Sequence, residues 1–243
     1  MILKLLRYFS IFLISILLVF SLFHQTLFAK EDRGGIQGNI RFSGQPSKVK
    51  NYIVNINQDI CGNSVESEDY SLNQENHGVK DIFVSMKNKN EEPSSVQLPE
   101  AEILDNIKCR LIPSVLGVRL NQIINIKNSD PVFHSLQFVD KDRLLYNIAL
   151  PNGGNVVRKK MDQIGMIEVR CTIHPFMQSS IYVSDTPFFS LTDKNGIFRM
   201  TGLKPGRYQF IANHKSFKRA EKEIDILPGK MINLNIDLEK LEE

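Results

Sequence analysis

Short apolar runs separated by turn sequences fill this chain of 243 residues from Gly34 onward, and no stretch shows a convincing long amphipathic helix. In several runs the apolar side chains recur at every second position, which is the periodicity of a strand with one buried face. Pairs such as Asn195-Gly196 and Pro205-Gly206 lie between the runs and favour turns. Many short strands joined by turns are typical of a sandwich or barrel. The sequence therefore predicts an all-β chain.

The expected strands follow from these runs. They are residues 36–42, 52–56, 79–86, 115–120, 122–127, 134–139, 165–171, 179–184 and, near the end of the chain, 224–227 and 232–238. We expect residues 146–154 to form an apolar loop that ends in a tight turn, because the run leads into Asn152-Gly153-Gly154.

The N-terminal segment, residues 1–29, has the pattern of an export signal. Lys4 and Arg7 precede an apolar core of about 13 residues, which is shorter than a typical membrane span. An uncleaved N-terminal membrane anchor is the alternative. Either way, we expect the rest of the chain to lie outside the cytoplasm, in the periplasm or otherwise exported. The formal net charge is only +3, which gives no support for a nucleic-acid surface.

Three cysteines, Cys61, Cys109 and Cys171, allow one disulfide and one remaining thiol in an exported protein. Cys61 and Cys109 both lie in loop-like or strand-edge sequence and are the natural pair. The alternative is that both stay reduced. Oxidising compartments favour the disulfide.

A thiol, an imidazole and a thioether stand three residues apart between two expected strands, in Cys171-Thr172-Ile173-His174-Pro175-Phe176-Met177. One turn between the strands would aim all three groups at one point, and His134 is the obvious source of a second imidazole. Soft sulfur donors with imidazole suit copper, especially Cu(I), whereas thioether is not a usual ligand of zinc. The alternative is a buried cysteine, a methionine in the core and two solvated histidines.

This order of donors resembles the blue-copper (cupredoxin) family, in which an upstream histidine and a Cys-x2-His-x2-Met type loop hold one copper ion. The resemblance implies a Greek-key β-sandwich over residues 34–185. It implies that His134, Cys171 and His174 are the trigonal ligands and that Met177 is the weak axial ligand. In the family, the loop histidine reaches the surface through an apolar patch and serves as the electron port. The residue after the upstream histidine is commonly Asn and orders the two ligand loops, but here it is Ser135.

The last part of the chain resembles the carboxypeptidase-regulatory-like (transthyretin-like) domains. The resemblance rests on two segments, Thr192-Asp193-Lys194-Asn195-Gly196-Ile197-Phe198 and Leu203-Lys204-Pro205-Gly206-Arg207-Tyr208. It implies a second, smaller β-sandwich over residues 187–240, and it implies no activity. The residues themselves predict a hairpin turn at 193–196, because Asn195-Gly196 is well suited to positive φ. Exported proteins that pair these two domains exist, and some carry a methylamine-utilisation label.

Together these features predict an exported mononuclear type 1 copper protein that transfers one electron and is not an enzyme. The expected partner is a redox protein such as a cytochrome or a dehydrogenase. A periplasmic copper storage or delivery protein, with the same ligands, is one alternative. A non-metal β-sandwich module for adhesion or scaffolding is another.

Overall fold

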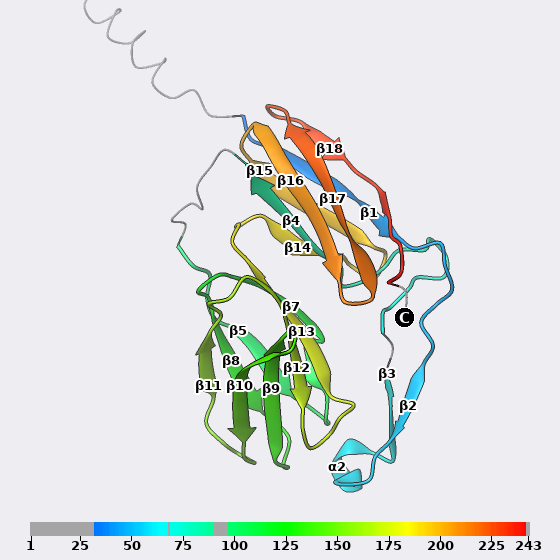
Figure 1. Ribbon diagram of the computed structural model, residues 1–243, viewed down its shortest axis with the longest axis vertical. Coiled ribbons are helices and arrows are strands. Elements are labelled where there is room, and N and C mark those ends of the chain that lie inside the picture. Colours follow the sequence, from blue (N-terminus) through cyan, green and yellow to red (C-terminus); the bar gives the residue numbers. More distant parts are fainter. Residues whose placement is uncertain (1–31, 68, 90–96, 242–243) are drawn as a thin grey trace, which may run out of the picture.

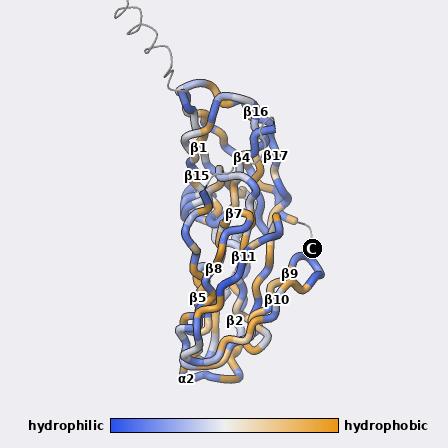
Figure 2. Tube along the Cα trace, turned by 90° about the vertical axis from the view of Figure 1, so that its left-hand side faces the viewer, coloured by the Kyte–Doolittle hydropathy of each residue, from blue (hydrophilic) through white to orange (hydrophobic). Residues whose placement is uncertain are grey.

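The computed structural model describes residues 32–241 apart from residue 68 and residues 90–96, so the predicted export signal lies outside the described residues. Nearly all of its regular structure is β-strand, arranged as two β-sandwiches that lie end to end along the long axis (Figure 1). Apolar and hydrophilic residues alternate along many of the strands (Figure 2). Among the described residues, no helix has the length and apolar character needed to span a membrane. The predicted all-β class is confirmed.

The first of the two sandwiches, which we call the middle sandwich, is formed by strands between residues 102 and 184. One sheet has the strand order β10-β9-β12-β13-β7 and the other the order β11-β8-β5-β6. Their bounds are β5 Glu102–Asn106, β6 Leu111–Ile112, β7 Val115–Arg119, β8 Ile123–Asn128, β9 His134–Asp140, β10 Arg143–Leu150, β11 Val157–Lys160, β12 Gly165–Cys171 and β13 Gln178–Ser184. Apolar side chains from both sheets, such as Ile124 and Phe138, share one core.

The second, which we call the terminal sandwich, is formed by strands that precede and follow those of the middle sandwich in the chain. One sheet has the order β14-β4-β16-β17, and in the other β15 and β18 flank β1, which also pairs with β19. Their bounds are β1 Gly34–Arg41, β4 Phe83–Asn88, β14 Phe189–Leu191, β15 Ile197–Leu203, β16 Gly206–His214, β17 Phe217–Ile226, β18 Met231–Asn233 and β19 Ile236–Asp237.

This strand pairing differs from the predicted domain boundaries of 34–185 and 187–240. Strand β1 pairs with β15, and β4 pairs with β16, although all of β1 and β4 precede residue 185. Ile36 and Ile40 of β1 and Val84 and Met86 of β4 are fully buried in the core of the terminal sandwich. Residues 187–240 alone would lack these strands, so the terminal sandwich requires both ends of the chain.

The turn at residues 193–196 forms, but the hairpin predicted there is wrong. The Asp193 carboxylate accepts hydrogen bonds from the N–H groups of Asn195 and Ile197 at 2.8 and 2.9 Å. The strands on either side, β14 and β15, belong to different sheets. The turn therefore carries the chain from one layer of the sandwich to the other.

The loop predicted at residues 146–154 is also wrong, because most of it belongs to strand β10. Ile148 and Leu150 are buried at alternate positions, and β10 pairs with β9 through Leu150↔His134. The pairing with a neighbouring strand supplies the hydrogen bonds that an isolated apolar loop would lack.

An arm, residues 50–67, leaves the terminal sandwich and runs beside the middle sandwich (Figure 1). It consists of strand β2 (Lys50–Ile53), the one-turn helix α2 (Gln58–Cys61) and strand β3 (Ser64–Ser67). Val54 and Val65 of the arm are buried in the core of the middle sandwich. The arm is therefore part of the middle sandwich, although the chain enters and leaves it from the terminal one.

His214 is a buried histidine of the terminal sandwich, only 6% exposed. Its Nδ1 atom accepts a hydrogen bond from the Ser216 N–H at 3.1 Å, and its ring contacts Phe217. Burial, with a smaller contribution from Lys215, lowers the pKa of His214 to about 4. Between that value and the pKa near 6.5 of an exposed histidine, the unfolded chain binds a proton that the folded chain excludes.

We predict that this exclusion costs stability as the pH falls. Between pH 7 and pH 4.5 the buried ring should contribute a loss of about 2 to 3 kcal/mol in the free energy of unfolding. His214→Asn should therefore lose less stability over this interval than the unchanged protein, as measured by urea unfolding of metal-free protein at both pH values. His77→Asn, at an exposed position, is the matched control. Equal losses in all three proteins would contradict the prediction.

Candidate metal centre

Three of the four predicted ligands meet in the interior of the middle sandwich. The Cys171 Sγ atom lies 3.8 Å from the Nδ1 atom of His134 and 3.8 Å from the Nδ1 atom of His174. The two Nδ1 atoms are 3.2 Å apart. His134 and His174 are 0% exposed and Cys171 is 3% exposed. One sulfur and two imidazole nitrogens therefore form a closed triangle that is shielded from water.

Strand pairing brings the three donors together. His134 is the first residue of β9, Cys171 is the last residue of β12, and the two strands pair through Cys171↔Leu136. His174 lies in the loop after β12. Hydrogen bonds from the Met177 N–H to the His174 carbonyl (2.9 Å) and from the Cys171 N–H to the Met177 carbonyl (3.1 Å) close this loop.

The second nitrogen of each imidazole has its own partner. The Nε2 atom of His134 lies 3.0 Å from a carboxylate oxygen of Asp130, and the Nε2 atom of His174 lies 3.2 Å from Oδ1 of Asn57. Both partners are acceptors, so each Nε2 carries the proton and donates it. Each Nδ1 atom then presents a lone pair to the centre of the triangle, which is the tautomer that a metal ligand requires.

The Asp130 carboxylate binds the backbone beside the site as well as the His134 ring. Its two carboxylate oxygens accept the N–H groups of Lys108 (2.5 Å) and Cys109 (2.8 Å) in addition to the His134 ring. Lys108, Cys109 and Asn57 all have positive φ angles, between 51° and 56°. Such conformations are uncommon outside glycine and cluster at functional sites. The two residues that hold the imidazoles are therefore tied to strained backbone.

The electrostatics of the site favour a thiolate. Burial raises the pKa of the Cys171 thiol, but the contact of its sulfur with the His134 ring and hydrogen bonds from the backbone of Ser135, His174 and Ile173 outweigh it, so the net pKa is lowered. Burial, followed by the proximity of His134, lowers the pKa of His174 and keeps its ring neutral. Thiolate and neutral imidazole are the ligand forms of these residues.

Ser135 joins the two ligand segments through its backbone. Its carbonyl accepts the Thr172 N–H at 2.9 Å, whereas its hydroxyl donates to Oδ1 of Asn147 instead. The two ligand segments are thus joined by a main-chain hydrogen bond and not by the Ser135 side chain.

The expectation that the loop histidine reaches the surface is wrong. His174 is fully buried, and Asn57, itself exposed, covers its Nε2 edge. Asn57 belongs to the arm, directly before α2. The arm therefore lies between this imidazole and solvent.

The predicted disulfide between Cys61 and Cys109 is present, with a Cα–Cα separation of 5.2 Å. It joins the arm to the segment between β5 and β6, beside Asp130. Cys171 remains a free, buried thiol, as the cysteine count predicted.

Met177 is buried, 1% exposed, in the core that also contains Cys171. Its backbone closes the ligand loop, as described above. Its role as a fourth ligand stays a prediction.

The donor triangle has the right size for a metal ion. The point equidistant from its three corners lies about 2.1 Å from each atom, close to the bonds of 2.0–2.1 Å that imidazole nitrogen and of about 2.3 Å that thiolate make to a first-row metal. Two lone pairs and a thiolate that converge on one buried point repel one another unless a cation lies between them. The residues present therefore fit a soft or borderline metal ion.

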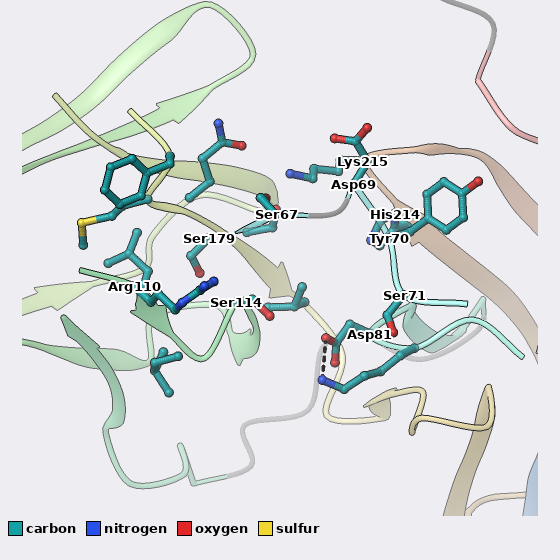
Figure 3. Close-up of a pocket in the computed structure, with 18 of the residues that line it drawn as sticks. Ser67, Asp69, Tyr70, Ser71, Asp81, Arg110, Ser114, Ser179, His214 and Lys215 are labelled. Atoms are coloured by element: carbon teal, nitrogen blue, oxygen red, sulfur yellow. Dashed lines mark ion pairs between the residues drawn. The ribbon is translucent and has the colours of Figure 1, made fainter. Parts of the chain in front are cut away.

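A cavity of about 420 Å³ lies between the two sandwiches (Figure 3). None of the three donors lines it. Phe176 and Met177 line it from the ligand loop, and His214 and Lys215 line it from the terminal sandwich. Solvent in this cavity reaches the back of the ligand loop, whereas the donors themselves stay enclosed.

Asn57 and Asp130 were missed by sequence reasoning. Asp130 lies four residues before His134, and this spacing is the one signal in the sequence that could have indicated it. Asn57 is 117 residues from His174, so no local pattern connects the two.

No family model and no curated protein matches this chain. Among solved structures, a reduced amicyanin mutant is 19% identical, with 41% of this chain and 99% of that chain covered at a TM-score of 0.32. A purple cupredoxin from Nitrosopumilus maritimus is 19% identical, with 42% and 97% covered at a TM-score of 0.29. A Cu-containing nitrite reductase from Thermus scotoductus SA-01 is 19% identical, with 38% and 25% covered at a TM-score of 0.30. At these low scores we base the function on the donor atoms of this chain.

We predict that Asp130→Asn destabilises the metal-free protein. An amide offers one acceptor oxygen in place of two charged ones, so at least one of the three N–H donors loses its partner in a buried place. The free energy of unfolding should fall by about 2 kcal/mol, measured by urea unfolding. Asp142→Asn, at an exposed position, should leave it unchanged. An Asp130→Asn protein as stable as this control would show that the hydrogen bonds of Asp130 do not stabilise the fold.

Proposed function

We propose that His134, Cys171 and His174 hold one copper ion and that the protein carries single electrons. The observation that carries this proposal is the buried triangle of one sulfur and two imidazole nitrogens. Thiolate and imidazole together are acceptable ligands to both oxidation states of copper. When bound, the ion exchanges one electron between Cu(I) and Cu(II). Met177 is the fourth ligand in this proposal.

The chain supplies a rigid ligand set. Asp130 and Asn57 fix the two imidazole rings, and β9 and β12 fix the positions of His134 and Cys171. Because the rings and the thiolate are held by hydrogen bonds that do not depend on the ion, little in the site needs to rearrange when the electron moves.

Enclosure favours an electron carrier over the other candidate functions. No donor is more than 3% exposed. An electron needs no opening to reach the site, whereas a substrate needs an open ligand position. A storage protein releases its ion readily, but here the arm and its disulfide cover the site. We therefore favour a carrier that is not an enzyme.

The partner in this proposal is a redox protein such as a cytochrome or a dehydrogenase. Since Asn57 covers the His174 ring, the partner would approach the site over the arm. The Cys61–Cys109 disulfide supports an exported location, because disulfides persist in oxidising compartments. The likeness of the terminal sandwich to carboxypeptidase-regulatory-like domains remains part of the proposal and adds no activity.

The first test is the visible absorption spectrum after Cu(II) is added to the protein from Lys30 onward. We predict an intense blue thiolate-to-copper charge-transfer band that disappears on reduction and returns on oxidation. Cys171→Ser should abolish the band, because it removes the only sulfur in the triangle. A Cys171→Ser protein that stays blue would refute the ligand assignment, and a colourless native protein would refute the proposed function.

Met177→Leu tests the fourth ligand. The blue band should persist, because the three donors of the triangle remain. The reduction potential should rise, since the axial ligand tunes it. A spectroelectrochemical titration measures both quantities. An unchanged potential would remove Met177 from the ligand set and leave the other three.

A further inference from the structure

The Cys61–Cys109 disulfide lies directly against the donor triangle. The two cysteine sulfurs and one ring nitrogen of His174 all lie within 4.8 Å of one another. The Cys109 sulfur also lies within 4.8 Å of a ring nitrogen of His134. Cys109 is 0% exposed and Cys61 is 8% exposed. The disulfide therefore lies beside both imidazoles of the proposed copper site.

We propose that these two cysteines, when reduced, form with His174 a second site that takes Cu(I). Two thiolates and an imidazole are a soft donor set, which is the type that Cu(I) prefers. The inference rests on the proposed function in that the two sites share His174 and the same metal. The second site exists only in the dithiol state, because disulfide sulfurs are not thiolates.

The backbone holds the two cysteines in place without the S–S bond. The Cys109 N–H is bound by Asp130 at 2.8 Å, and the Cys61 N–H donates to the Asn57 carbonyl at 2.8 Å. Two thiolates on one metal ion stand about 4 Å apart, against about 2 Å in a disulfide. Rotation of the two side chains on a fixed backbone supplies this change.

The chemistry balances with a dithiol reductant. Attack of its thiolate on Cys61, the more exposed sulfur, breaks the S–S bond. Two electrons and two protons pass to the cysteine pair, and the reductant leaves as its own disulfide. Binding of Cu(I) then displaces the two thiol protons to solvent. Reoxidation by a disulfide oxidant returns two electrons and two protons and removes the second site.

Because the two sites share His174, the second site can deliver Cu(I) to the donor triangle. The donor triangle is enclosed, and the arm covers its His174 side. An ion held by Cys61, Cys109 and His174 is already bound to one ligand of the triangle. It reaches the triangle by exchanging two sulfur ligands for Cys171 and His134. Formation of the disulfide then removes the two thiolates and prevents the ion from returning to the second site.

The test measures Cu(I) by competition with a chromophoric chelator, without oxygen. Cys171→Ser disables the triangle and isolates the second site. With a phosphine reductant present, this variant should bind one more Cu(I) per chain than its matched control, in which Cys61 and Cys109 are also changed to Ser. With the disulfide intact, the two proteins should bind equally. Equal binding of the reduced variant and the control would overturn the proposal.

A second measurement uses the same Cys171→Ser variant. In its reduced form, Cu(I) should lower alkylation of Cys61 and Cys109 by iodoacetamide at least tenfold, as read by mass spectrometry of peptides. Equal alkylation with and without Cu(I) would also overturn the inference. Failure of the proposed function is separate, because it is read from the blue band of the oxidised native protein. That band tests the triangle and does not depend on reduced Cys61 or Cys109.

Discussion

The convergence of two imidazole lone pairs and one thiol sulfur on a single buried point is the constraint on which the rest of the structure depends. These groups repel one another when no cation lies between them, so the surrounding chain must hold them in place. It does so through the far side of each ring, where Asp130 and Asn57 fix the tautomers. The free energy that ordering the site costs is offset by the packing of the middle sandwich around it.

The arm connects the site to the remainder of the molecule. The described part of the chain enters the terminal sandwich with β1, crosses to the middle sandwich as the arm, and returns to the terminal sandwich with β4. On this excursion it covers His174 and forms the disulfide with Cys109. The covering of the imidazole and the disulfide beside it are thus features of one segment. This arrangement is why enclosure of the site and the redox state of the cysteine pair are linked in our inference.

Sequence reasoning succeeded where the signal was local. The strand β12 that ends at Cys171 and the single thiol left over from three cysteines were both read from short segments. It failed where a segment's role depends on a distant partner. Strand β10 has an alternating pattern that becomes meaningful only beside β9, and the turn after Asp193 crosses between sheets because β14 and β15 find different neighbours.

The sequence by itself determined the all-β class and the types and spacing of the donors, because side-chain periodicity and short loops are properties of neighbouring residues. The tertiary structure alone decided which strands complete each sandwich and what covers the site. The pairing of β1 with β15 and the hydrogen bond from His174 to Asn57 join residues more than 100 positions apart. Such contacts depend on which sheet edges and buried polar groups remain unpaired after the local elements form, and no local pattern records that.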